Sequence, residues 1–180
     1  RAATSASSIA TGRWYPASKR GKRVTRVRHI DLNADVGEAT DPAGVETERA
    51  LLGLVTTAHV ASGGHAGDKE TMSATVAAAL EHGVRVGAHP SYPDREGFGR
   101  RPMDIDGDEL RAALSEQLRA LATVCASAGT EIATVKAHGA LYEEVAKGGD
   151  RYQVLRDVVA AECPPMTPLV LRSGCHAMAM

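Results

Sequence analysis

Hydrophobic residues recur along this chain in two alternating patterns, as short continuous runs and as stripes with helical spacing. Between Asp68 and Gly83, four apolar residues fall on one face of a helix: Met72, Val76, Ala79 and Leu80. The segment 106–129 carries a longer stripe of leucines between Asp106 and Gly129, and Asp and Gly are typical start and stop residues of helices. We expect helices at 46–55, 68–83, 106–129 and 151–161, and β-strands at 27–32, 56–62, 84–90, 131–136 and 168–173.

Strict alternation of strands and helices predicts an α/β protein with a parallel sheet and right-handed crossovers. Two architectures fit this pattern, an open doubly wound sheet and a (β/α) barrel. Both place their ligands at the carboxyl ends of the strands. The residues that follow each expected strand are therefore the candidates for a functional site.

Polar and titratable groups follow all five expected strands. A single histidine in such a place is most often a hydrogen-bonded turn residue, but His65, His89 and His138 follow three different strands, which favours an enzyme pocket. In chain order the groups are Asp31, Asn33, Asp35 and Glu38; Ser62, His65 and Asp68; His89 and Asp94; Lys136 and His138; Arg172 and His176.

The acidic residues after the first strand are open to two interpretations. Asp31, Asn33 and Asp35 alternate, so they face one side if the strand continues. Two carboxylates held close together either raise the pKa of one of them, which suits a general base, or share a divalent cation. A plain turn over 33–37 explains the same residues. Lys136 ends an apolar strand and needs either a ligand or an acidic partner, Asp31 or Asp35.

Two loops are suited to anions. Gly63 and Gly64 precede the helix that begins near Asp68, whose free N–H groups fit an anion unless Asp68 itself caps them. The loop 90–104 is long and contains three arginines, which can hold a carboxylate or phosphate, although a solvated surface loop is the alternative. The arginines are Arg95, Arg100 and Arg101.

Composition narrows the class of protein. The 180 residues suit one domain, with 43% hydrophobic residues, 3% aromatic residues and a net charge of −1. Few aromatic residues disfavour nucleic-acid binding, and we expect no membrane span. Three cysteines without C-x-x-C spacing, and no secretory signal, indicate a reducing, cytoplasmic location. No G-x-x-x-x-G-K-[ST] phosphate loop is present.

The first 28 residues differ from the rest of the chain, with eight Lys or Arg and no Asp or Glu. This composition fits a transit peptide, a disordered basic arm, or sequence upstream of the true start. We expect an N-terminal arm at 1–28 and one domain at 29–180.

Four segments together resemble the LamB/YcsF family, whose members are the A components of 5-oxoprolinase. They are DLNADVGE (31–38), HAGDKETM (65–72), GAHPSYPDREGFGRRPM (87–103) and VKAHGALY (135–142). The resemblance implies a (β/α) barrel of the glycoside hydrolase/deacetylase type, here truncated at its C-terminal end. It also implies ATP-dependent opening of the lactam of 5-oxo-L-proline to L-glutamate, with partner subunits B and C and a divalent cation accompanying ATP.

This chemistry assigns roles to the candidate residues. Asp35 or Asp31 would be the base for water, Lys136 with His138 the charge stabiliser, and His65 a proton carrier. Arg100 or Arg101 would clamp the substrate carboxylate, with Asn33 and His89 as further substrate-binding residues. Two alternatives remain: a metal-dependent deacetylase or hydrolase of carbohydrate or amide substrates, in which Asp31 or Asp35 with His65 and His138 bind the ion, and an inactive truncated scaffold.

Overall fold

The computed structural model of the chain describes residues 30–173. The expected basic arm at 1–28, the beginning of the expected strand 27–32, and His176 lie outside these residues. The described part contains four strands and five helices in the order β1 (Asn33–Val36), α1 (Pro42–Leu52), β2 (Thr57–Ala61), α2 (Lys69–Glu81), β3 (Arg85–His89), α3 (Gly107–Ser127), β4 (Thr134–Val135), α4 (Gly139–Ala146) and α5 (Asp150–Glu162). The expected α/β architecture is confirmed.

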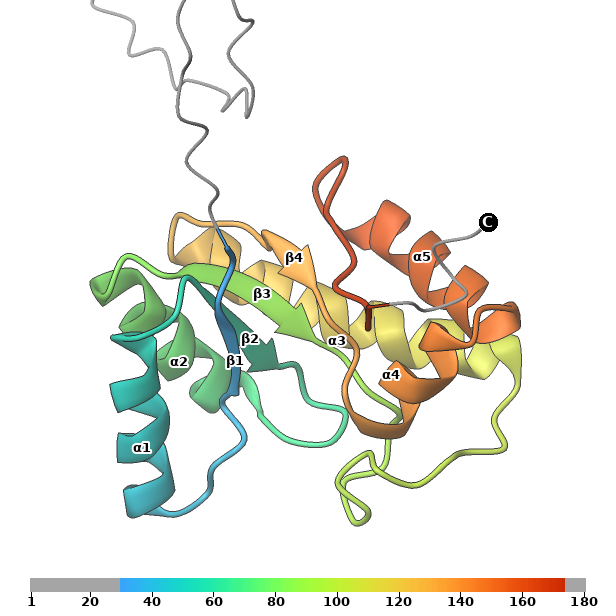
Figure 1. Cartoon of the computed structure of the whole chain (residues 1–180), viewed down its shortest axis with the longest axis horizontal. Helices are drawn as coiled ribbons and strands as arrows, with labels where there is room; N and C mark the ends of the chain where they lie inside the picture. The colour runs from blue at the N-terminus through green and yellow to red at the C-terminus, as the bar shows by residue number, and fades with distance from the viewer. Residues whose placement is uncertain (1–29, 174–180) are drawn as a thin grey trace, which may run out of the picture. The chain divides into compact units, whose positions relative to one another are not determined.

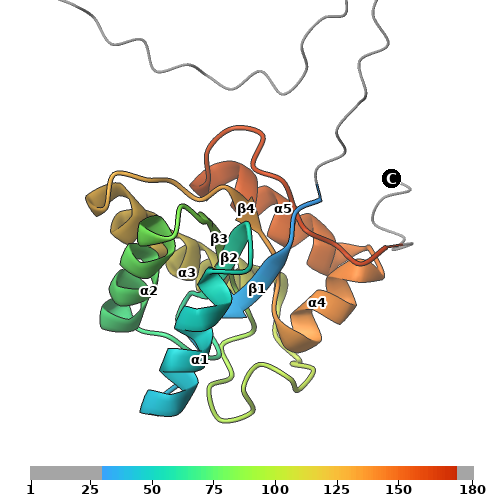
Figure 2. The same cartoon turned by 60° about the vertical axis from the view of Figure 1, so that its left-hand side comes forward.

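All four strands are parallel, and their order in the sheet follows their order in the sequence, β1-β2-β3-β4. When successive strands advance in one direction with right-handed crossovers, the crossover helices lie on the same face of the sheet. Figures 1 and 2 show α1, α2 and α3 following one another along the sheet, while α4 and α5 lie together near β4. The sheet does not close into a barrel within the described residues.

An aspartate is the N-cap residue of each of the three crossover helices, α1, α2 and α3. Asp41 accepts hydrogen bonds from two backbone N–H groups of α1, whose first residue is proline. Asp68 caps α2 by accepting from Thr71 N, and Asp106 caps α3. Asp68 therefore satisfies a donor that was otherwise a candidate for binding an anion.

The hydrophobic core fills the space between the sheet and these helices. Because side chains alternate along a strand, β2 and β3 turn one set of residues toward the helices and the other set away. The buried apolar strand residues pack in one core with the leucine stripe of α3 and the apolar face of α2. The strands contribute Val36, Ala58, Val60, Val86, Ala88 and Val135, and the helices contribute Met72, Val76, Leu110, Leu114, Leu118 and Leu121. The opposite face of the sheet is polar.

Several expected elements differ from the structure. The first strand lies at 33–36 rather than ending at 32, and α1 begins at Pro42 rather than near 46. The expected strand 131–136 shortens to Thr134–Val135, and the strand expected at 168–173 is reduced to a single parallel bridge between Val135 and Leu169. These segments are apolar, but most of their residues do not form the regular hydrogen bonds of a parallel ladder. Apolar composition alone therefore overestimates the length of a strand.

Helix α4 was not expected from the sequence. It begins at Gly139, whose φ is +55°, and its N-cap residue His138 makes no side-chain cap. A helix of eight residues that lacks a capping aspartate gives little sequence signal. Its formation depends on the burial of Leu141 and Val145. None of the helices in residues 30–173 combines the length and apolar character needed to cross a bilayer.

Candidate functional site

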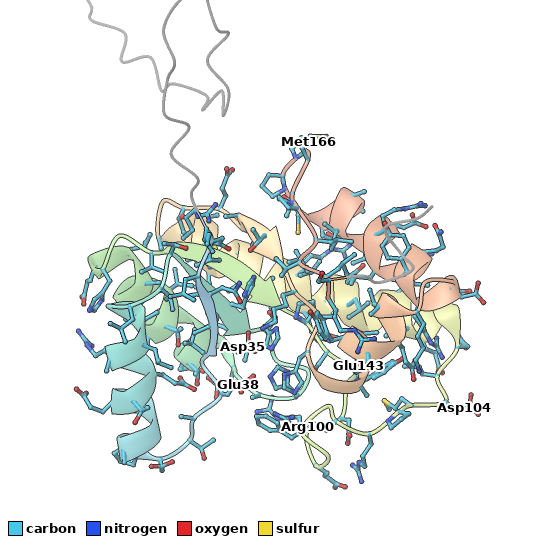
Figure 3. All side chains as sticks on the ribbon, viewed as in Figure 1. Asp35, Glu38, Arg100, Asp104, Glu143 and Met166 are labelled. Carbon is cyan, nitrogen blue, oxygen red and sulfur yellow. The ribbon has the colours of Figure 1, made fainter. Side chains whose placement is uncertain are left out.

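The polar face of the sheet and the loops that leave its carboxyl end bring six titratable side chains together. Asp35 lies on β1, and Glu38 follows that strand. His65 comes from the loop after β2, and His89 is the last residue of β3. Lys136 and His138 follow β4. Figure 3 places Asp35 and Glu38 on the β1 side and Glu143 on the α4 side, with Arg100 below them.

An ion pair between Asp35 and Lys136 crosses the polar face. Lys136 Nζ lies 2.7 Å from Asp35 Oδ1 and 2.9 Å from Oδ2, with the two side chains 20% and 33% exposed. Burial opposes the charge on Asp35, but hydrogen bonds and positive charge from His89 and Lys136 outweigh it, so the pKa of Asp35 lies well below its usual value. Of the two acidic partners expected for Lys136, the structure selects Asp35.

Glu38, His65, His89 and His138 form a compact cluster beside this ion pair. Glu38 Oε1 lies 2.9 Å from His65 Nε2, 3.4 Å from His138 Nδ1 and 3.7 Å from His89 Nε2. The three histidines are buried, and the rings of His65 and His138 stack with their centroids 3.7 Å apart. One ligand atom from each of the four residues lies within 4.8 Å of the others, so these residues are suited to hold a metal ion.

Burial sets the charge state of the cluster. It lowers the pKa of His65, and it lowers that of His138 to about 4, with the charges of the neighbouring imidazoles acting in the same direction. Burial also opposes the charge of Glu38, but a hydrogen bond from His65 and the nearby imidazoles prevail and lower its pKa. At neutral pH the cluster therefore combines a carboxylate with neutral rings of His65 and His138.

The long loop, residues 90–104, closes one side of the cluster. Phe98 has a φ of +53°, a strained conformation for a bulky residue, and its carbonyl accepts a hydrogen bond from His138 Nε2 at 2.9 Å. The Phe98 ring meets the rings of His65 and His138 edge-on. Arg95 ties the loop to the β2–α2 connection through the carbonyls of Gly63 and Gly67.

A cavity of about 450 Å³ opens in front of the ion pair and the cluster. Its walls combine acidic, basic and imidazole groups with backbone from the start of α4. This volume accommodates a small metabolite. The polar side chains in the lining belong to Asp35, Glu38, His89, Arg100, Lys136, His138, Tyr142 and Glu143.

Four of the expected site residues do not line this cavity, and one of them, His65, is buried within the cluster. Asp31 sits at the amino end of the sheet, where its carboxylate accepts hydrogen bonds from Thr56, Thr57 and Arg85. It therefore cannot share an ion or a proton with Asp35, and its expected metal-binding role is corrected. The side chain of Arg101 is 61% exposed and forms an ion pair with Asp94. Asn33 lies two residues before Asp35, on the same face of β1, but it does not line the cavity. Among the arginines of the long loop, Arg100 is the one that lines the cavity.

Two supporting residues were not identified from the sequence. The carboxylate of Glu48 on α1 accepts hydrogen bonds from three consecutive N–H groups, those of Gly37, Glu38 and Ala39, at 2.8, 3.1 and 2.9 Å. It thereby fixes the loop that carries Glu38. His59 on β2 lies beneath the ion pair, with Nε2 3.0 Å from Thr134 Oγ1. No sequence signal distinguishes Glu48 from Glu46, the other acidic residue of its helix, whereas His59 occupies a strand position in phase with Thr57.

Comparisons with known proteins agree on one family. The LamB/YcsF family model matches residues 30–179. The A component of 5-oxoprolinase from Methylococcus capsulatus is 46% identical over 134 residues, covering 74% of this chain and 52% of the relative. A protein of the same name from Neisseria meningitidis is 43% identical over 151 residues, covering 82% of this chain and 58% of the relative.

A solved structure shows the same arrangement of the chain. The lactam utilization protein from Thermus thermophilus superimposes with a TM-score of 0.77 at 35% identity, covering 84% of this chain and 61% of that protein. The chain thus spans a little over half the length of the relatives it matches.

Proposed function

Because this chain belongs to the LamB/YcsF family, we propose that it is the A component of an ATP-dependent 5-oxoprolinase, which opens the lactam of 5-oxo-L-proline to give L-glutamate. The name that its relatives carry, as A components of 5-oxoprolinase, supports this assignment. The observation in this chain that carries it is the Asp35–Lys136 ion pair facing a cavity large enough for a single five-membered ring.

A lactam is a poor electrophile, so its hydrolysis needs activation. In the proposed reaction ATP phosphorylates the lactam oxygen and water then attacks the ring carbon. The C–N bond of this adduct then breaks, which frees the nitrogen as the amino group and leaves an acyl phosphate. A second water hydrolyses the acyl phosphate to give glutamate and inorganic phosphate. Since the sequence lacks a G-x-x-x-x-G-K-[ST] loop, we assign ATP and its divalent cation to the assembled enzyme, in which subunits B and C are the partners.

The geometry suggests a division of labour within the cavity. Lys136 and Arg100 both line the cavity. In the proposed mechanism Lys136 stabilises the developing negative charge on the lactam oxygen, and Arg100 holds the substrate carboxylate. Asp35 is fully ionised but weakly basic while Lys136 pairs with it. An anionic group that binds Lys136 weakens this ion pair and raises the basicity of Asp35, so that it can accept a proton from the attacking water.

The test is turnover by the complex reconstituted from this chain and subunits B and C. We expect Asp35→Asn and Lys136→Met each to lower 5-oxoproline-dependent glutamate formation by a factor of about 100 or more. Asp31→Asn is the matched control, because the carboxylate of Asp31 lies at the opposite end of the sheet, and it should retain turnover within about twofold. Wild-type rates from both cavity variants would refute the assignment.

A second candidate, a metal-dependent hydrolase of amide or acetyl groups, is favoured by the convergence of Glu38 with three histidines. It predicts hydrolysis by this chain without ATP and without partner subunits. Release of acetate from acetylated sugars, or opening of simple amides, measured on the isolated chain with and without added zinc distinguishes the two. Turnover that strictly requires ATP rejects this second candidate.

A further inference from the structure

Two ring nitrogens in the cluster face each other in an arrangement that neutral histidines alone do not favour. His89 Nε2 and His138 Nδ1 lie 3.1 Å apart. The opposite nitrogen of each ring meets a backbone carbonyl, with His89 Nδ1 2.7 Å from Lys136 O and His138 Nε2 2.9 Å from Phe98 O. A carbonyl only accepts hydrogen bonds, so each of those outer nitrogens carries the proton of its ring.

With a single proton on each ring, both inner nitrogens present lone pairs toward the same point. Glu38 Oε1, a third electron-pair donor, lies 3.4 Å from the inner nitrogen of His138 and 3.7 Å from that of His89. Donors that converge in this way repel one another unless a positive charge lies among them. One proton can bridge only a single pair of these atoms, whereas a metal ion satisfies all of them.

The spacing of the donor atoms fits a small ion with four ligands. Zinc–nitrogen and zinc–oxygen bonds of about 2.0–2.1 Å in a tetrahedron place neighbouring ligand atoms roughly 3.3 Å apart. The pairs measured here, including Glu38 Oε1 to His65 Nε2, lie between 2.9 and 3.7 Å. All four donor atoms lie within 4.8 Å of one another.

The surroundings resemble those of metal-binding histidines elsewhere. Such histidines almost always donate their second N–H to a carbonyl or carboxylate, which fixes the tautomer and the direction of the lone pair. His89 and His138 both do so, and Phe98 adopts its strained backbone conformation in the segment that supplies one of these carbonyls. His65 is held instead by stacking on His138 and by the edge of the Phe98 ring.

We propose that Glu38, His65, His89 and His138 bind one transition-metal ion of the zinc class through Glu38 Oε1, His65 Nε2, His89 Nε2 and His138 Nδ1. Three imidazoles and one carboxylate suit zinc, and they disfavour magnesium and calcium, which prefer oxygen ligands. An ion held there supplies a Lewis acid at the wall of the cavity. This proposal goes beyond the lactam assignment, because the division of labour proposed above uses Asp35, Lys136 and Arg100 and does not use a metal ion held by these four side chains.

Metal content of the purified 180-residue chain is the direct test. After removal of metal with a chelator, loading with zinc and dialysis, we expect one zinc ion per chain by elemental analysis. His138→Gln should lower zinc affinity by a factor of at least about 100. His82→Gln is the control, because His82 is exposed at the end of α2 and should leave affinity unchanged. Less than a tenth of an ion per wild-type chain, or equal losses in both variants, would overturn the proposal.

X-ray absorption by the zinc-loaded wild-type chain gives a readout that does not depend on the folding of a variant. We expect three imidazole ligands and a four-coordinate ion, and the cobalt-substituted chain should show the intense visible bands of tetrahedral Co²⁺. An ion surrounded by six oxygen atoms would contradict the proposed ligands. Neither measurement involves 5-oxoproline, so a failure of the lactam assignment leaves this result independent.

Discussion

At the scale of single residues, the missing side chain of Gly87 decides how the polar face is built. His59 on β2 reaches across β3 to Thr134 on β4, and its ring passes directly over Gly87. A Cβ atom at position 87 would overlap that ring. The imidazole is fully buried, and its pKa is lowered to about 4 by burial first and then by the charges of His89 and Lys136.

We predict that His59 makes the fold sensitive to acid. In the unfolded chain His59 takes up a proton near pH 6.5, but in the folded chain only near pH 4. Its contribution is complete above pH 6.5 and is lost as the pH falls toward 4, because the unfolded chain then binds the additional proton. When the pH is lowered from 6.5 to 4, the free energy of unfolding should decrease by about 3 kcal/mol less in His59→Gln than in the wild type. Urea unfolding at a series of pH values measures the difference, and parallel curves for the two proteins would contradict it.

At the scale of elements, the loop between β1 and α1 depends on one carboxylate. Glu48 accepts hydrogen bonds from the N–H groups of residues 37–39 and so holds the segment from which Glu38 enters the cluster. Consecutive N–H groups that converge on one anion form a strong local site, because each bond is assisted by charge. A residue of α1 thereby orients a side chain of the functional site without touching the cavity.

Removal of this carboxylate should be costly. In Glu48→Ala three partly buried N–H groups lose their acceptor, and we expect the free energy of unfolding to fall by about 2 kcal/mol. Amide hydrogen exchange of residues 37–39 should also become faster. Glu46→Ala, an exposed change on the same helix, serves as the control and should cost less than about 0.5 kcal/mol. Similar exchange rates in Glu48→Ala and the wild type would show that the loop is held by other contacts.

The sequence revealed those elements whose local chemistry agrees with the fold. Helices α2 and α3 were placed within two residues at each end, because each buries one apolar stripe and follows an aspartate cap. The first strand was placed too early, because β1 alternates Asn33 and Asp35 with Ala34 and Val36 and so resembles a loop after an apolar run. Parallel strands predicted that Asp35, His65, His89, Lys136 and His138 would lie together, and the structure brings them together.

Other features depend on contacts between distant segments. Asp31 lies outside the cavity because β1 begins after it, at Asn33. Arg101 forms an exposed ion pair with Asp94 because of the path that the long loop takes. The contact of Glu48 with the β1–α1 loop likewise requires the fold to be known. Spacing along the chain contains no information on such contacts.

At the scale of the whole molecule, the two faces of the sheet in the described domain have different roles. One face packs into the hydrophobic core, and the other carries the polar groups of the candidate site. The leucines of α3 and the inward residues of the strands fill one side, and the ion pair and the cluster occupy the other. Helix α5 packs on α3 and on α4 and adds Val154, Leu155, Val158 and Val159 to the core, but it does not contribute to the cavity lining. The two sides should therefore respond differently to substitution.

A substitution in the core tests this separation. Leu114 is fully buried on α3, and Leu114→Ala should lower the free energy of unfolding by about 3 kcal/mol through lost burial and the cavity left behind. Leu80→Ala, on the partly exposed side of α2, should cost less than about 1 kcal/mol. Urea unfolding compares the two, and turnover measured well below the unfolding transition should stay near wild type for both. Equal stability losses would show that α3 is not the centre of the core.

The order of the strands also bears on how the site is assembled during protein synthesis. Strands β2, β3 and β4 each pair with the strand that precedes them in the sequence. None of these pairings therefore requires a later part of the chain. Among the clustered groups Asp35 is synthesised first and His138 last, and all of them precede α5 in the chain. A nascent chain can thus gather these side chains progressively, one strand at a time.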